Sequence, residues 1–124
     1  MKYFLSIGSN INAEKNIKLA LSELGKIFIN FYISSTHETE SEGFEGDNFL
    51  NLVTSGETNL EFDELNKILK QIEDKSGRDR SAPKFSARTL DIDIVLQIDD
   101  DEVIFESDEI EKYKFVSDPL KEIL

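Results

Sequence analysis

Residues 88–96 read Arg88-Thr89-Leu90-Asp91-Ile92-Asp93-Ile94-Val95-Leu96, and this stretch decides the fold. Its alternation of polar and apolar residues predicts a β-strand whose successive side chains point to opposite faces of a sheet. Asp91 and Asp93 then lie side by side on one face, with Val95 beyond them. The other face is apolar and is expected to pack on a core, and its residues are Leu90, Ile92, Ile94 and Leu96.

Two neighbouring carboxylates on a rigid strand form a candidate cation site. They repel each other unless a cation or water lies between them, and such hard oxygen ligands suit Mg²⁺ bound together with substrate phosphates. Arg78 and Arg80 lie upstream, and Arg88 directly precedes the pair. Because Mg²⁺ and arginine together stabilise the charge of a transferring phosphoryl group, the pattern favours phosphoryl transfer. A half-exposed strand with a solvated polar face is the alternative.

The composition predicts a single globular domain over residues 1–124. Hydrophobic residues make up 39% of the chain and include nine phenylalanines, which favours a real core over disorder. The chain has no cysteine, so disulfides and thiolate metal sites are excluded and a reducing compartment, the cytoplasm, is expected. No apolar run reaches the ~18 residues of a membrane span.

The charge of the chain is strongly acidic overall and uneven along its length. A net charge of −12 argues against binding to nucleic acid or to acidic membranes, both of which need a cationic face. The segment from Lys75 to Arg88 differs, because its basic residues are Lys75, Arg78, Arg80, Lys84 and Arg88. A basic segment on an acidic body predicts a local anion site.

The expected elements follow the order β-α-β-β-α-β. Strands are expected over residues 3–7, 31–39, 48–58 and 88–96, and amphipathic helices follow Asn12 and Asn59, the second ending at Gly77. This is the order of the α+β, ferredoxin-like fold, in which a four-stranded antiparallel sheet carries both helices on one face. Function is then expected on the open face, where Asn51, Asp91 and Asp93 would lie.

Several short motifs carry a family resemblance that covers nearly the whole chain. They are Leu5-Ser6-Ile7-Gly8-Ser9-Asn10, Ser34-Ser35, Phe49-Leu50-Asn51, Ile72-Glu73, Gly77-Arg78-Asp79-Arg80 and Arg88-Thr89-Leu90-Asp91-Ile92-Asp93-Ile94. In this order and spacing the chain resembles the 6-hydroxymethyl-7,8-dihydropterin pyrophosphokinases. These folate-pathway enzymes move a diphosphate from ATP to a pterin alcohol.

The resemblance implies a role for each matching residue on the nucleotide side. Asp91 and Asp93 match the aspartates that hold two Mg²⁺ ions bridging the phosphates of ATP. Arg78 and Arg88 match catalytic arginines that act on the transferring phosphates. The positions implied to contact ATP are Glu73, Arg80 and Arg88.

The resemblance also implies a pterin pocket and a mechanism. Phe49 and Phe115 match aromatic residues that stack on the two faces of the ring, Asn51 an amide that reads its edge, and Thr39 a residue of the pocket. From the residues alone, ordinary core is the favoured interpretation of the two phenylalanines, and a solvated strand residue is the alternative for Asn51. The implied reaction is in-line attack of the pterin hydroxymethyl oxygen on the β-phosphorus of ATP, under a lid formed by residues 77–88.

The chain departs from the family pattern at several positions. Glu40 follows Thr39 where the family usually has proline, and Phe85 stands where a tryptophan is common. Residues 105–108 replace a Pro-His pair, and Tyr113 replaces an arginine. Two alternatives therefore stay open: a pterin- or nucleotide-binding relative without turnover, and an unrelated ferredoxin-like ligand-binding module. For the pyrophosphokinase reading we expect a monomer.

Overall fold

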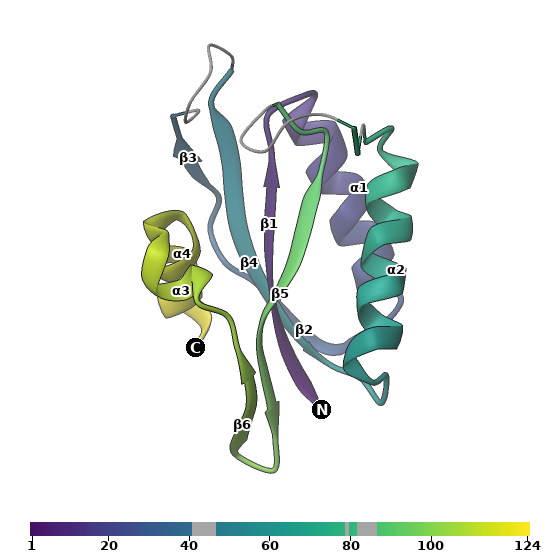
Figure 1. Ribbon diagram of the computed structural model, residues 1–124, viewed down its shortest axis with the longest axis vertical. Helices are drawn as coiled ribbons and strands as arrows, with labels where there is room; N and C mark the ends of the chain where they lie inside the picture. The colour runs from purple at the N-terminus through teal and green to yellow at the C-terminus, as the bar shows by residue number, and fades with distance from the viewer. Residues whose placement is uncertain (41–46, 79, 82–86) are drawn as a thin grey trace.

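A computed structural model describes residues 1–40, 47–78, 80–81 and 87–124. Within them the chain forms an antiparallel sheet and four helices, so the α+β class is confirmed (Figure 1). The strands are β1 (Lys2–Ser9), β2 (Ile29–Ile33), β3 (His37–Thr39), β4 (Phe49–Glu57), β5 (Asp91–Asp99) and β6 (Glu102–Glu106). The helices are α1 (Ala13–Gly25), α2 (Phe62–Lys75), α3 (Glu109–Lys112) and α4 (Lys114–Ile123).

The sheet has more strands than the four expected. Its order is β2-β4-β1-β5-β6, and β3 also pairs with β4. The expected second strand is split because the Ser34 hydroxyl accepts a hydrogen bond from Val53 N at 2.9 Å, in place of a strand carbonyl. The sixth strand exists because Asp100 and Asp101 both adopt positive φ, the geometry of a two-residue hairpin turn.

Helices cover both faces of the sheet. The two expected helices share one face as predicted, but the expectation that the other face is open is wrong. Helices α1 and α2 lie together on one side of the sheet, and α3 and α4 lie on the other (Figure 1). The first side buries a large core that includes Leu5, Leu24, Leu69 and Ile92. The second buries a smaller core made of Phe4, Val53, Val95, Leu96, Val116 and Leu120. The described residues contain no helix with the length and apolar character needed to cross a membrane.

An irregularity in β5 explains why Leu96 belongs to the second core. Phe4 pairs with Leu96 while the next residue, Leu5, pairs with Ile94, so Val95 is an extra residue opposite β1. A bulge of this kind turns the strand and changes which face the following side chains occupy. The prediction that Leu96 shares a face with Ile94 is therefore wrong. Asp91 and Asp93 precede the bulge and keep the predicted alternation.

The C-terminal helix, which packs on the sheet through Val116 and Leu120, is also joined to the sheet edge by a carboxylate. Glu122 accepts hydrogen bonds from the backbone N–H and the hydroxyl of Ser35, both at 2.8 Å, and lies 2.5 Å from His37 Nε2. The backbone hydrogen bond from Ser35, followed by the His37 contact, lowers the pKa of Glu122 to about 2. His37 thus joins β3 to α4.

Replacing Glu122 by Gln should weaken this junction in a pH-dependent way. The folded pKa of Glu122, about 2, lies below the ~4.3 of an unfolded glutamate, so its ionised form stabilises the fold above that value. The stabilisation is lost as pH falls from about 4 toward 2, because the carboxylate is then protonated in both states. We expect Glu122→Gln to lower the thermal midpoint at pH 6, and the difference from wild type to shrink by pH 3. Glu111→Gln, an exposed change on α3, is the control; a difference independent of pH would contradict the assignment.

Candidate active site

The sheet register places the candidate metal and pterin residues in neighbouring rows. Asn51 of β4, Gly8 of β1 and Asp91 of β5 pair directly across the three strands. Val53, Ser6 and Asp93 form the next row. Because directly opposed residues share a face, Asn51 and the two aspartates lie on the side of the sheet that α3 and α4 occupy. The predicted grouping of these side chains on one face is confirmed.

Asp91 and Asp93 are half-exposed, and each has a cation beside it. Arg78 Nη1 lies 2.8 Å from Asp91 Oδ1, and Lys70 Nζ lies 3.7 Å from Asp93 Oδ1. Burial, and then the neighbouring Asp91 carboxylate, raises the pKa of Asp93 to about 7. The pair therefore favours a proton or a cation between its oxygens.

The donor set of this pair fits Mg²⁺. Both side chains are 36% exposed, so a ligand can reach them, and all their donor atoms are hard oxygens. Among the described residues no third His, Cys, Asp or Glu completes a metal-binding group. Such a two-carboxylate site leaves most of the coordination shell to water and phosphate oxygens, as is usual for Mg²⁺ bound with a nucleotide.

Glu73, the residue at the centre of the site, is completely buried. Its Oε2 accepts a hydrogen bond from Ile92 N at 2.7 Å, which fixes the end of α2 against the start of β5. Its Oε1 lies 2.9 Å from Arg78 Nη1 and 3.0 Å from Arg80 Nη1. Lys70 Nζ approaches Oε2 at 3.4 Å. Glu73 was expected to contact the nucleotide, and this structure places it beneath the cations that face the site.

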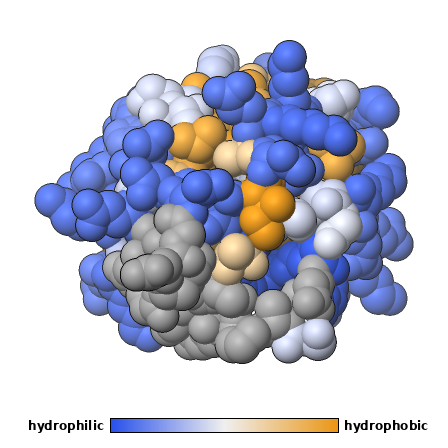
Figure 2. Space-filling view, turned by 90° about the horizontal axis from the view of Figure 1, so that it is seen from above, coloured by the Kyte–Doolittle hydropathy of each residue, from blue (hydrophilic) through white to orange (hydrophobic). Residues whose placement is uncertain are grey.

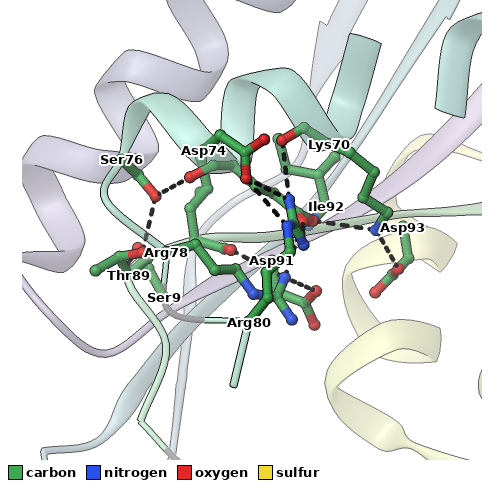
Figure 3. A network of polar contacts seen from close by, with 12 residues as sticks. Ser9, Lys70, Asp74, Ser76, Arg78, Arg80, Thr89, Asp91, Ile92 and Asp93 are labelled. Carbon is green, nitrogen blue, oxygen red and sulfur yellow. Dashed lines mark hydrogen bonds and ion pairs between the residues drawn. The ribbon is translucent and has the colours of Figure 1, made fainter. Parts of the chain in front are cut away.

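The two arginines after α2 extend from this buried carboxylate toward β5. Figure 3 shows Arg78 and Arg80 between the end of α2 and the aspartates of β5. Arg78 bridges Glu73 and Asp91 with a side chain only 11% exposed. Arg80 is more exposed, and also pairs with Asp74 at 2.9 Å and donates to the Lys70 carbonyl. Arg78 is therefore a fixed cation at the pair, whereas Arg80 lies at the rim.

Arg88 is anchored through its backbone. Its N–H donates to Asn10 Oδ1 at 2.7 Å, and its carbonyl accepts from Asn10 N at 3.0 Å. The next residue, Thr89, is held by Ser9, whose hydroxyl donates to the Thr89 carbonyl at 2.5 Å. The strand thus enters the sheet in a fixed position beside Gly8. The expected lid over residues 77–88 includes Asp79 and Phe85, which lie outside the described residues.

The candidate pterin residues come from three elements. Asn51 is 4% exposed and donates through Nδ2 to Thr39 Oγ1 at 2.7 Å, and Thr39 pairs with Phe49 in the sheet. Phe115 is the second residue of α4, which packs on β4, and its ring stacks on that of Tyr113 with centroids 4.8 Å apart. The structure thus brings Thr39, Phe49 and Asn51 together, and Phe115 borders the second core.

Lys70 is a charged residue of the site that the sequence analysis missed. It lies one helical turn before Glu73 on α2 and contacts both Glu73 and Asp93. Its spacing of three residues from Glu73 is the only sequence signal that could have indicated a shared face.

A hollow of about 830 Å³ lies away from these residues. Ile17 and Leu21 of α1, Thr36 and Leu50 are among its lining residues, and the three apolar ones belong to the core on the opposite side of the sheet. Figure 2 looks onto the loop end of the molecule from above and shows hydrophilic side chains around a small apolar centre. The candidate active site is therefore defined by its charged side chains and not by this hollow.

Comparison with known proteins identifies the family. A family model described as 7,8-dihydro-6-hydroxymethylpterin-pyrophosphokinase matches residues 4–124. The 2-amino-4-hydroxy-6-hydroxymethyldihydropteridine pyrophosphokinase of Bacillus subtilis (strain 168) is 31% identical over 128 residues, covering 97% of this chain and 76% of the relative. The protein of the same name from Aquifex aeolicus (strain VF5) is 34% identical over 99 residues, covering 78% of this chain and 61% of the relative.

A longer kind of relative also matches. The folate synthesis bifunctional protein of Chlamydia muridarum (strain MoPn / Nigg) is 38% identical over 104 residues, covering 77% of this chain and 23% of that relative. The chain thus spans less than a quarter of this bifunctional protein. The family model nonetheless covers nearly all of the chain, and the Bacillus match covers most of both proteins. The chain therefore belongs to the 7,8-dihydro-6-hydroxymethylpterin-pyrophosphokinase family.

Proposed function

We propose that this protein transfers a diphosphate from ATP to 6-hydroxymethyl-7,8-dihydropterin, giving AMP and the pterin diphosphate. The observation that carries the proposal is the half-exposed pair Asp91 and Asp93 with Arg78 fixed beside it. Membership of the family supports the same activity. An adjacent carboxylate pair and a fixed guanidinium supply the opposite charges that a metal-bound triphosphate needs.

The residues divide into a phosphate side and a pterin side. Arg78 and Arg88 would stabilise charge on the transferring phosphates, and Arg80 with the buried Glu73 would hold the nucleotide side in place. Asn51 and Thr39 would bind the ring edge, between the rings of Phe49 and Phe115. Asp91 and Asp93 would hold two Mg²⁺ ions, which when bound supply positive charge to the phosphate oxygens.

The chemistry requires only positioning and charge. The pterin hydroxyl oxygen forms a bond to the β-phosphorus, the bond from that phosphorus to the α–β bridging oxygen breaks, and AMP leaves with the oxygen. The hydroxyl proton passes to solvent, and no covalent enzyme intermediate forms. Arg78 is well placed to stabilise this charge, because Glu73 and Asp91 already orient its guanidinium.

We also propose the finer features of the fold and setting. The strand order β2-β4-β1-β5 with α1 and α2 on one face supports a ferredoxin-like core, to which β6, α3 and α4 are added. The net charge of −12 supports a protein that binds neither nucleic acid nor acidic membranes. A monomer in the cytoplasm stays a prediction.

A binding relative without turnover is the second candidate. Tyr113 stands where the family has an arginine and stacks on Phe115, which leaves no cation at that place. Glu109 at the start of α3 is an acidic residue close enough to Asp91 to repel it: burial, and then the Asp91 carboxylate, raises the pKa of Glu109. Both features weaken the attraction for ATP.

An AMP-release assay separates these candidates. The protein is mixed with ATP, MgCl₂ and the pterin alcohol, and products are separated by chromatography. We expect AMP and pterin diphosphate in equal amounts, and no AMP when the pterin is omitted. Calorimetric binding of both substrates without AMP would favour the binding relative, and absence of any Mg²⁺-dependent nucleotide binding would favour an unrelated module.

A further inference from the structure

A strip without side chains separates the pterin and metal residues. Asn51 and Asp91 both pair directly with Gly8, on opposite sides of β1. Adjacent strands lie about 4.8 Å apart, so the Cα atoms of Asn51 and Asp91 are separated by roughly 10 Å. Both side chains rise from the same face, and Gly8 contributes nothing between them. The floor between the two groups is therefore bare backbone.

The lack of space for a side chain explains why residue 8 is a glycine. A Cβ atom built on Gly8 would lie 2.9 Å from Asn51 Oδ1, closer than real contacts allow. Gly8 does not adopt positive φ, so its backbone conformation would accept another residue. Glycine inside a strand weakens the strand and often marks a place that a ligand approaches closely.

The Asn51 amide has little freedom to yield to a side chain at this position. It is 4% exposed, and its Nδ2 is committed to Thr39 Oγ1 at 2.7 Å. Its Oδ1 is turned toward the bare strip above Gly8. A side-chain atom at position 8 would fit only if the Asn51 amide rotated. That rotation would disturb the hydrogen bond from Asn51 Nδ2 to Thr39 Oγ1.

We propose that Gly8 is a positioning residue, whose missing side chain lets the substrate pass from the Asn51 amide to the phosphates at Asp91. The hydroxymethyl group would lie over this strip, directly between the two side chains that bind the two substrates. This inference rests on the proposed function. In this proposal the missing side chain of Gly8 sets how closely the two substrates approach each other. Neither the Asp91 carboxylate nor the Asn51 amide can set that distance.

Gly8→Ala tests the proposal by measuring the two substrates separately. We expect the KM for the pterin to rise about tenfold or more, ~1.4 kcal/mol in binding terms, while a nonhydrolysable ATP analogue binds as to wild type. Gly25→Ala is the matched control, because a Cβ there meets nothing within 4 Å. Gly56→Ala controls for a purely structural clash, since its Cβ would meet Phe28 at 2.6 Å, and it should lower the thermal midpoint without a pterin-specific change.

A double variant identifies the route of the effect and guards against misfolding of the single one. In an Asn51→Ala background the clash with the amide is absent, but a methyl group on residue 8 still fills the strip, so Gly8→Ala should still raise the pterin KM there. No further rise in KM in that background would mean that the effect runs only through the Asn51 amide, and would overturn the proposal. Gly8→Ala with the wild-type pterin KM, or with an equal loss for both substrates, would overturn the proposal. A wild-type protein that makes no AMP and binds no pterin would instead reject the proposed function, and the inference with it.

Discussion

Replacing Asp91 or Asp93 by Asn is expected to lower AMP formation at least about a hundredfold while the fold persists. Asn keeps the size of the side chain but removes the charge that faces Arg78 and Lys70. Charged groups of this kind act mainly in the transition state, so kcat should fall more than ATP binding weakens. Steady-state AMP release at saturating pterin and a fixed Mg²⁺ concentration measures this effect.

The same variants provide a stability readout that a misfolded protein could not mimic. The folded pKa of Asp93, about 7, lies above the ~3.9 of an unfolded aspartate, so ionisation of Asp93 opposes folding as pH rises through this range. Without Mg²⁺, Asp93→Asn should therefore have a thermal midpoint at pH 8 no lower than wild type. Asp63→Asn, an exposed change on α2, is the control for activity. Near-normal AMP formation by both site variants would reject the metal assignment.

The part of the site that was predictable from sequence depends on local periodicity. Alternation along β5 places Asp91 and Asp93 on one face, and alternation along β4 does the same for Phe49 and Asn51, because two-residue periodicity is intrinsic to a strand. The burial of Glu73 was not predictable, since it depends on how the end of α2 meets β5. A glutamate late in an amphipathic helix has the sequence features of a surface residue.

The features of the fold that sequence periodicity missed have physical causes in particular residues. The extra residue Val95 interrupts the alternation of β5 and moves Leu96 to the second core. The hairpin to β6 depends on positive φ at Asp100 and Asp101, whose sequence reads as a solvated acidic run. The position of Gly8 between the pterin and metal residues was not predictable from periodicity, because it depends on the pairing of Gly8 with Asn51 and Asp91.

Replacing Glu73 by Ala is expected to have the largest effect on stability in this protein. The carboxylate is completely buried and contacts Arg78, Arg80 and Lys70. Removing one member of a buried ionic group typically costs about 3–5 kcal/mol, because the remaining charges lose their compensation. The Ile92 amide adds to the loss, since an unpaired buried N–H costs roughly 1–3 kcal/mol. Asp91 still pairs with Arg78, and Asp74 still pairs with Arg80. The total loss of unfolding free energy should therefore lie near the lower end of these ranges.

Urea unfolding of Glu73→Ala, Glu73→Gln and wild type tests this expectation, with Glu111→Ala on the exposed face of α3 as control. Gln keeps the volume and one acceptor for the Ile92 N–H, so Glu73→Gln should lose less stability than Glu73→Ala. It still leaves Arg78 and Arg80 without their shared counter-charge, so AMP formation should fall in both variants, even under conditions where both are fully folded. If Glu73→Gln kept wild-type turnover, Glu73 would be a structural anchor for Ile92 alone, and the arginines would be oriented by Asp74 and Asp91. Equal unfolding free energies for all four proteins would contradict the buried position of Glu73 at the centre of its ion-pair network.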